Sequence, residues 1–243
     1  WVGPTCDGPA WVSTGDVSGD EIDDVVVACM SSDDIMVHFN DGAGNLLPGR
    51  AYPAGDGPKG MALSDLEGDG DLDVIVASTR SSTLTIHWND GFGGFDSVET
   101  MDSEGNPRSV VAVDVDSDGD PDLVSSARRS DLLRVFANDG LGGFSAPTND
   151  ASGDWPRTLA TGDFDNDGDL DLAVTNVMSN EISIHLNDGL GNFELAESIV
   201  GEGLPRDVIA DDRDGDGLVD LVVAGLDRDS VTFLRNLGEL RFV

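Results

Sequence analysis

The sequence predicts an all-β protein, a five-bladed β-propeller in which residues 1–243 form a single domain. The first observation is a repeat of 49 residues: five such repeats amount to 245 residues, and the chain has 243. The second is that each repeat reads as four short strands, and four-stranded units of roughly 40 to 50 residues are typical of propeller blades. The third is that no segment keeps a helical period.

Two markers keep this period without an insertion. One is the tripeptide Asn-Asp-Gly, which begins at Asn40, Asn89, Asn138 and Asn187 and leaves a relic at Asn236. The other is an acidic cluster, which begins at Asp16, Asp65, Asp114, Asp163 and Asp212. The marked parts of the repeats span residues 16–46, 65–95, 114–144, 163–193 and 212–242. Because two independent markers share one period, chance similarity is a poor explanation.

The fourth repeat shows the expected elements in order. Residues 157–161 form an apolar first strand, the acidic loop follows over 163–171, and 172–174 begin the second strand. The third strand, residues 182–186, alternates apolar with polar side chains, which is the period of a strand with one buried face. Asn-Asp-Gly then turns the chain, since these residues accept positive φ, and Phe193 opens the fourth strand.

The two ends of the chain predict how the propeller closes. Val243 aligns with Glu194 just inside a fourth strand, and Trp1 and Val2 align with positions later in that strand. We therefore expect the N-terminal residues to complete the last blade, so that the ring has no exposed edge. The alternative is that the chain is part of a larger ring.

The charge balance excludes some classes of partner. The chain has 48 acidic and 13 basic residues, which gives a net charge of −35. Nucleic acid and anionic membrane surfaces need a basic footprint, so both are poor partners. The longest apolar run is residues 25–30, far short of the roughly 20 residues that a membrane-spanning helix needs.

The acidic clusters share one pattern of oxygen-bearing positions. At positions 1, 3, 5, 7 and 9 the five loops contain Asp16, Ser18, Asp20, Ile22 and Asp24; Asp65, Glu67, Asp69, Asp71 and Asp73; Asp114, Asp116, Asp118, Asp120 and Asp122; Asp163, Asp165, Asp167, Asp169 and Asp171; and Asp212, Asp214, Asp216, Leu218 and Asp220. Position 6 is Gly in every loop except the first, where it is Glu21.

This spacing predicts calcium sites. Calcium takes six to eight oxygen ligands. Carboxylates at positions 1, 3 and 5 of a tight turn can converge, the carbonyl at position 7 turns inward, and the Asp at position 9 closes the site. An EF-hand would carry Glu at position 12, where these loops have Val or Ser, so flanking helices are not expected. The alternatives are aspartates that only solvate turns, and magnesium, which prefers a tighter octahedron.

The loops, followed by Asn-Asp-Gly-x-Gly-x-Phe as in residues 187–193, resemble FG-GAP/VCBS-type repeats. Such repeats build the calcium-binding propeller heads of integrin α-subunits and of many secreted microbial and algal proteins. The resemblance covers all five repeats and implies up to five calcium ions between first and second strands, with the site at 16–24 the weakest. The repeats are shorter and fewer than in integrins, so an integrin-like partner is not implied.

A second periodic feature lies at the opposite end of the repeats. A basic residue opens the first strand of four repeats: Lys59, Arg108, Arg157 and Arg206. First strands are innermost in a propeller, so these cations would ring the mouth of the central channel. Trp11 and Trp155 lie beside them in the sequence pattern and would provide stacking surfaces for a sugar. The alternative is that each cation pairs with a nearby acid.

The histidines and cysteines have simpler interpretations. His38, His87 and His185 share one repeat position, which Phe136 fills in the third repeat, so packing between blades is favoured over a metal or catalytic role. Cys6 and Cys29 both fall near the variable-loop end of the first blade, and a disulfide between them suits an oxidising compartment.

The predicted function is non-enzymatic. We expect a calcium-binding propeller that serves as a binding or scaffolding module for a protein or glycan, within a larger protein or assembly in one interpretation. Calcium sites suit a secreted, cell-surface or organelle-lumen protein, whose secretion signal would have been removed. The alternatives are a calcium-dependent lectin that binds acidic glycans through the basic ring, and a polysaccharide lyase-like enzyme.

Overall fold

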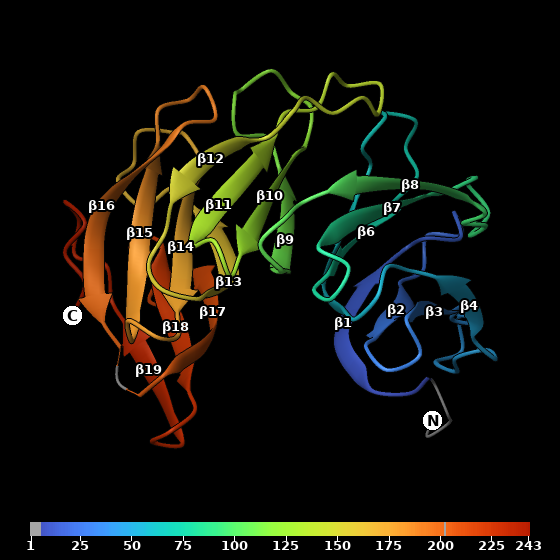
Figure 1. The fold of residues 1–243 in the computed structure, drawn as a ribbon, viewed down its shortest axis with the longest axis horizontal. Coiled ribbons are helices and arrows are strands. Elements are labelled where there is room, and N and C mark those ends of the chain that lie inside the picture. Colours follow the sequence, from blue (N-terminus) through green and yellow to red (C-terminus); the bar gives the residue numbers. More distant parts are fainter. Residues whose placement is uncertain (1–5, 202) are drawn as a thin grey trace.

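A computed structural model of the protein describes residues 6–201 and 203–243, and Figure 1 shows its fold. These residues form 19 strands in five antiparallel sheets, and none of them lies in a helix. Consequently, the described residues include no helix that is long and apolar enough to cross a membrane.

The strands follow the repeats. The first sheet contains β1 (Pro9–Gly15), β2 (Asp24–Cys29), β3 (Asp34–His38) and β4 (Arg50–Pro53). The second contains β5 (Pro58–Ser64), β6 (Asp73–Ser78), β7 (Thr83–Trp88) and β8 (Ser97–Asp102). The third contains β9 (Pro107–Val113), β10 (Asp122–Ala127), β11 (Leu132–Phe136) and β12 (Thr148–Ala151). The fourth contains β13 (Pro156–Gly162), β14 (Asp171–Asn176), β15 (Glu181–Asn187) and β16 (Phe193–Val200). The fifth contains β17 (Pro205–Asp211), β18 (Asp220–Gly225) and β19 (Ser230–Leu234).

Each sheet is an antiparallel meander whose strands pair in sequence order. The first strands are innermost and pack in series, β1 on β5, β5 on β9, β9 on β13 and β13 on β17. Figure 1 shows the five sheets arranged around one axis as the blades of a propeller. The predicted fold class, an all-β five-bladed propeller, is therefore confirmed.

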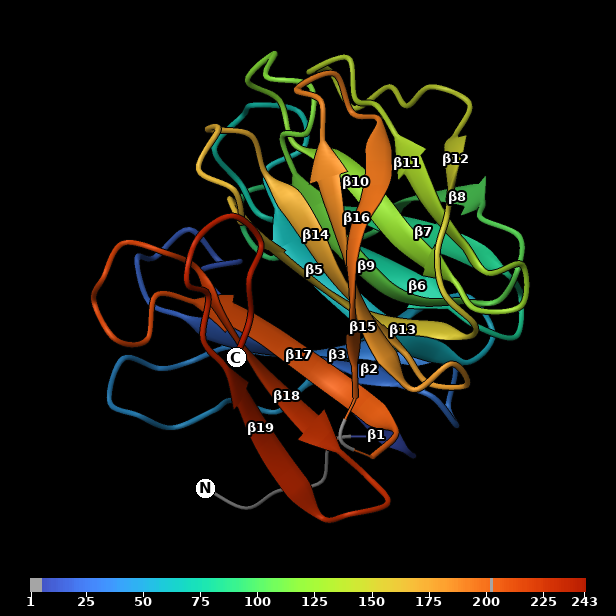
Figure 2. The ribbon, with the colours of Figure 1, turned by 90° about the vertical axis from the view of Figure 1, so that its left-hand side faces the viewer.

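The closure of the ring falls outside the described residues. The prediction assigned Trp1 and Val2 to the last blade, and residues 1–5 are not described. In the part of the chain that is described, the fifth sheet has three strands, with β19 at its edge (Figure 2). An open side separates this sheet from the first sheet in Figure 1.

The core lies between neighbouring blades rather than in one central mass. Four buried apolar clusters fill the four interfaces between consecutive sheets, because second and third strands bury both faces. In the first interface, for example, Ile35 and Val76 are fully buried. On the open side of the fifth sheet, by contrast, Val231 is 74% and Ile209 is 50% exposed.

In the second to fifth blades, the Asn that begins the Asn-Asp-Gly turn or its relic joins the blade to the one before it. Asn138 is buried, and its Nδ2 donates hydrogen bonds to the carbonyls of Leu66 in the preceding blade (2.8 Å) and Pro121 in its own blade (3.0 Å). Asn89, Asn187 and Asn236 make equivalent bonds to the preceding blade. The tripeptide was predicted as a hairpin turn, and this second role accounts for its regular recurrence.

Candidate functional site: acidic loops and a basic cavity

The acidic loops connect the first and second strands of every blade. In the third blade, β9 ends at Val113 and β10 begins at Asp122. The turn requires positive φ at position 6, where Gly119 has φ 99° and Gly168 has φ 100°. Glu21 adopts the same region with φ 66° although it is not Gly, so the first loop keeps the turn under strain.

Three loops gather the carboxylates that sequence spacing predicted as metal ligands. The side chains at positions 1, 3 and 9 bring carboxylate oxygens within 4.8 Å of one another in the third, fourth and fifth loops. These residues are Asp114, Asp116 and Asp122; Asp163, Asp165 and Asp171; and Asp212, Asp214 and Asp220. The first and second loops are not gathered in this way within the described residues.

The third and fourth loops also leave carboxylate oxygens without a partner. Oδ1 of Asp114, Asp116 and Asp163 is buried and accepts no hydrogen bond within the described structure. In all five loops Oδ2 of the position 1 carboxylate accepts a hydrogen bond from the amide at position 6. In the first, second and fifth loops Oδ1 also accepts one, as where Asp65 Oδ1 accepts from the Gly68 amide (2.8 Å). A buried, unpartnered carboxylate oxygen is costly, so the third and fourth loops fit a divalent cation that prefers oxygen ligands.

The electrostatics of these loops agree with that fit. Burial raises the pKa of Asp116 and of Asp165, and their neighbours Asp118 and Asp167 add to the rise by charge repulsion. A bound cation would remove this repulsion and stabilise the ionised carboxylates.

The Asp at position 9 also ties the loop to the Asn-Asp-Gly hairpin. Asp122 is fully buried, its Oδ2 accepts a hydrogen bond from the Val115 amide (3.0 Å), and its Oδ1 accepts one from the Asn138 amide (2.8 Å). The same pair of bonds recurs in every blade. Burial raises the pKa of Asp73 and of Asp171 to about 6. The sequence did not predict this hydrogen bond between the acidic loop and the hairpin. The constant separation between the acidic cluster and the Asn-Asp-Gly turn in every repeat was the feature that could have indicated it.

Positions 5 and 7 lie outside the gathered carboxylates. The position 7 side chain faces the hairpin, where a Cβ on Gly140 would lie 2.2 Å from Asp120 Oδ2. In the fifth loop, Arg235 forms ion pairs with Asp214 and with Asp216, the latter at 3.0 Å. Since Arg235 already neutralises one of the gathered carboxylates, a cation in the fifth loop competes with it.

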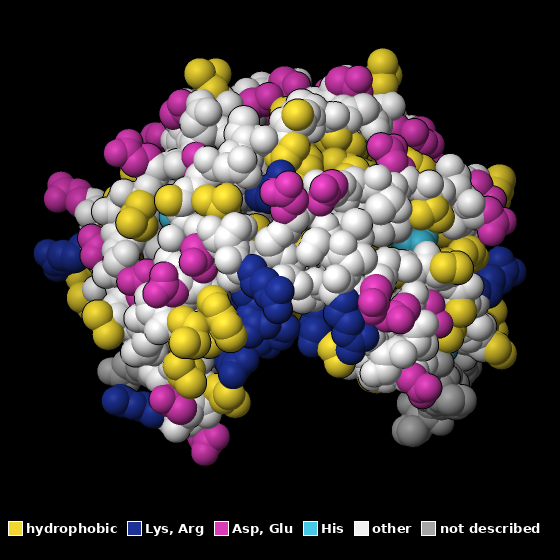
Figure 3. All heavy atoms as spheres, viewed as in Figure 1, with side chains coloured by type: hydrophobic (Ala, Val, Ile, Leu, Met, Phe, Trp, Pro, Cys, Tyr) yellow, Lys and Arg dark blue, Asp and Glu magenta, His cyan; other side chains and the backbone are white. Residues whose placement is uncertain are grey.

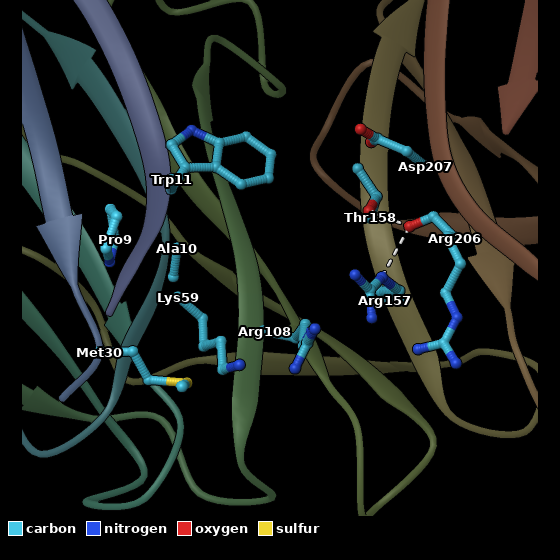
Figure 4. Close-up of a pocket in the computed structure, with 10 residues that line it drawn as sticks. All are labelled: Pro9, Ala10, Trp11, Met30, Lys59, Arg108, Arg157, Thr158, Arg206 and Asp207. Atoms are coloured by element: carbon cyan, nitrogen blue, oxygen red, sulfur yellow. Dashed lines mark hydrogen bonds between the residues drawn. The ribbon is translucent and has the colours of Figure 1, made fainter. Parts of the chain in front are cut away.

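The four periodic bases line one cavity of about 390 Å³ on the central axis (Figure 4). Lys59, Arg108, Arg157 and Arg206 occupy the second position of β5, β9, β13 and β17. Trp11 and Met30 line the same side of the cavity as Lys59, across from Arg157 and Arg206. Figure 3 shows Lys and Arg side chains gathered where the propeller is open. The structure thus brings together the basic residues that the repeat aligned.

None of these bases forms an ion pair among residues 6–201 and 203–243, although the Asp207 carboxylate lines the same cavity and attracts Arg157 at longer range. The ion pairs found there involve other bases, Arg80, Arg134, Arg213 and Arg235. Burial lowers the pKa of Arg108 to about 10, and the positive charges of Arg157, Arg128 and Arg206 contribute. The pKa of Lys59 is lowered for the same reasons, first by burial and then by Arg108 and Arg157. The alternative of local ion pairs is therefore not found in the described structure.

The structure separates the two tryptophans. Trp11 lines the basic cavity, whereas Trp155 lies in another hollow of about 260 Å³, with Asn106 and Arg128. The Arg128 guanidinium lies 4.0 Å from the centre of the Trp155 ring in a cation–π contact. Trp155 therefore does not line the cavity that the four bases share.

The histidines and cysteines are not among the residues that line the basic cavity or form the gathered carboxylate clusters. His87 is fully buried and neither ring nitrogen has a hydrogen-bond partner in the described part of the chain, while His185 Nε2 lies 2.8 Å from Ser183 Oγ. Burial lowers the pKa of both rings to about 4. Cys6 and Cys29 form a disulfide with their Cα atoms 5.8 Å apart.

Comparison with known proteins places the repeats in a family. A family model described as FG-GAP-like repeat matches residues 16–76, 65–125 and 121–174, which together are more than half of the chain. No curated protein sequence matches.

Solved structures share the fold at low identity. An Agrocybe aegerita lectin described as recognising non-reducing terminal N-acetylglucosamine is 19% identical with a TM-score of 0.67, over 97% of this chain and 65% of that one. BBS1N, solved in complex with ARL6DN, is 16% identical with a TM-score of 0.66, over 98% and 67%. Virginiamycin B lyase from Staphylococcus aureus is 13% identical with a TM-score of 0.65, over 97% and 69%. The chain thus spans about two thirds of the length of these proteins, and the likeness shows the fold alone.

Proposed function

This chain belongs to the FG-GAP-like repeat family, and on that premise we propose that it is a calcium-loaded, non-enzymatic binding module. Its ligand is a protein or a glycan, met outside the cell or in an organelle lumen, where calcium is abundant. The observation that carries the proposal is the third loop, in which Asp114, Asp116 and Asp122 converge while two of their oxygens remain buried without partners.

The residues of the loop define what calcium would do. The carboxylates of Asp114 and Asp116 would hold the ion, and calcium would neutralise them and cross-link the turn. Fixing Asp122 would also fix the hairpin, because the Asp122 carboxylate accepts a hydrogen bond from the amide of Asn138. Asn138 in turn bonds to the preceding blade. A metal in one loop therefore stabilises an interface between two blades as well as its own turn.

The binding role is supported by the fold and by the uses that neighbours make of it. The described neighbours include a glycan-binding lectin and a protein solved with a protein partner. Another neighbour is virginiamycin B lyase, which shows that this fold also carries lyases, and a polysaccharide lyase is the second candidate that the sequence left open. A β-elimination assay on acidic polysaccharides separates the two, and we expect no unsaturated product.

Thermal unfolding in calcium and in chelator tests the proposal. At ten times its Kd, each calcium site adds about 1.4 kcal/mol to the free energy of unfolding, so three sites add about 4 kcal/mol. A gain of that size raises the melting temperature of a chain this long by roughly 10 °C. Asp116→Asn should lose about a third of the gain.

Asp96→Asn is the matched control, because Asp96 is an exposed aspartate outside the loops. It should keep the whole calcium-dependent gain. A melting temperature that is the same in calcium and in chelator would contradict the proposal, and so would an equal gain in the wild type and Asp116→Asn.

A further inference from the structure

We propose that the basic cavity on the propeller axis is the binding site for an anionic saccharide, whose sulfate or carboxylate groups contact Arg108, Arg157 and their neighbours while a sugar ring packs against Trp11. This inference rests on the proposed binding function and names the class of ligand. The cavity, of about 390 Å³, lies within the range of roughly 300 to 1,000 Å³ that small-molecule sites occupy.

The need for an anion follows from the excess of positive charge in the cavity, where four cations face the one carboxylate of Asp207 among the lining residues. The cavity draws four cations from four consecutive inner strands, and none of them pairs with an acid among the described residues. Arg206 Nε is buried and has no hydrogen-bond partner among the described residues, and Arg157 Nε donates to the backbone carbonyl of Arg206 at 2.7 Å. Cations that are partly desolvated and close together repel one another, and a ligand with several negative charges relieves this repulsion.

The rest of the wall distinguishes a saccharide from a bare anion. In Figure 4, Trp11 lies above Lys59 on one side of the cavity, and Asp207 lies beside Arg206 on the other side. An aromatic face packs against the apolar face of a sugar ring, and a carboxylate accepts hydrogen bonds from sugar hydroxyl groups. Asp207 repels an anionic group, so the charged substituents are directed to the side of Lys59 and Arg108.

The net charge of the molecule limits how such a ligand binds. At −35 the protein repels a polyanion at long range, so binding depends on contacts within the cavity rather than on steering. This disfavours long nucleic acids, which need an extended basic surface. It favours a short anionic chain end that enters the cavity.

Calorimetric titration with three tetrasaccharides tests the inference: one sulfated from heparin, one from hyaluronan with carboxylates only, and neutral maltotetraose. Wild-type protein in saturating calcium should bind one or both anionic probes and bind maltotetraose at least tenfold more weakly. The double variant Arg108→Gln/Arg157→Gln should lose at least tenfold in affinity. Arg50→Gln/Arg241→Gln makes the same change in net charge at exposed positions outside the cavity and should stay within twofold.

Two further variants keep the test independent of folding defects. Trp11→Leu removes the ring and should weaken saccharide binding about tenfold. Because Trp11 also packs against the first apolar cluster, this variant should melt at a lower temperature, and its binding is measured well below that temperature. Without ligand, Arg108→Gln should raise the melting temperature, because it relieves charge repulsion. Equal affinity of the wild type and Arg108→Gln/Arg157→Gln, or equal binding of maltotetraose, would overturn the inference.

Terbium luminescence in the same samples reports the acidic loops separately. Terbium bound with no anionic saccharide bound would refute this inference and leave the calcium proposal intact. Saccharide bound with no terbium bound would support the basic site and refute the calcium proposal. A preference between the sulfated and carboxylated probes identifies which anionic group the cavity selects.

Discussion

Single buried polar residues connect the parts of this molecule. Asp122 accepts hydrogen bonds from the amides of Val115 and Asn138, and Asn138 donates across to the carbonyl of Leu66 in the preceding blade. Because buried polar groups are expensive when unpaired, each of these residues fixes the position of several others. The chain of bonds runs from metal loop to hairpin to neighbouring blade.

The hydrogen bonds between blades give a testable difference between two asparagines. Asn138→Ala removes two donated bonds and leaves the Leu66 carbonyl buried without its partner, so it should lower the free energy of unfolding by about 2 to 3 kcal/mol. Among the described residues, the Asn40 side chain donates only to the Asp23 carbonyl, in its own blade and at an exposed position, so Asn40→Ala should have less than half that effect. Urea denaturation in saturating calcium measures both, and equal losses would contradict this role.

The buried histidines predict a loss of stability in acid. The pKa of His87 and of His185 is about 4 in the folded protein and about 6.5 when exposed in the unfolded chain. As the pH falls from 6.5 to 4 the unfolded chain takes up protons that the folded protein does not. Stability present above pH 6.5 is therefore lost across this window, by up to about 3 kcal/mol for each ring.

Replacing both rings isolates this effect from other titrating groups. His87→Phe/His185→Phe should lack the acid-sensitive component, and Phe136 already occupies the equivalent position in the third blade. The free energy of unfolding, measured from pH 7.5 to 4.5 in one calcium buffer, should fall less steeply in the variant. Parallel curves for the two proteins would rule out the histidines as its source.

At the scale of elements, the sequence predicted much of the candidate site, because the repeat period aligns equivalent positions. Carboxylates at positions 1, 3 and 9 converge in three loops, and the aligned bases share one cavity. The sequence did not predict that Arg235 forms an ion pair with Asp214. It also did not predict that Trp155 makes a cation–π contact with Arg128 outside the basic cavity. Those contacts depend on side-chain directions and on neighbouring strands, which spacing within one repeat does not determine.

The inner strands β5 and β9 make a close approach that depends on Gly60. A Cβ on Gly60 would lie 2.6 Å from the Arg108 carbonyl oxygen and 2.7 Å from Ser109 Cα, both of which are backbone atoms. Gly60→Ala must push the strands apart and should lower the free energy of unfolding by about 2 to 3 kcal/mol. Gly44→Ala, in an exposed hairpin with φ 84° and no atom within 4 Å, should lower it by about 1 kcal/mol. Chemical denaturation compares them, and a harmless Gly60→Ala would contradict the close packing.

At the scale of the whole molecule, the 49-residue period predicted the number and order of the blades because every repeat needs a neighbour to bury its faces. The four filled interfaces follow directly from that rule. The period does not determine how the first and last blades meet, since that contact has no counterpart within a repeat. Val231 and Ile209 are exposed because no neighbouring blade covers this face of the fifth sheet in the described structure.

The number of calcium ions that the folded protein binds tests the central claim most directly. Equilibrium dialysis against radioactive calcium should give at least two tightly bound ions, in the third and fourth loops, and a weaker one in the fifth loop. Asp116→Asn and Asp165→Asn should each remove one tightly bound ion, and Asp96→Asn should remove none. No bound calcium, or a number of ions that these loop substitutions leave unchanged, would contradict the account.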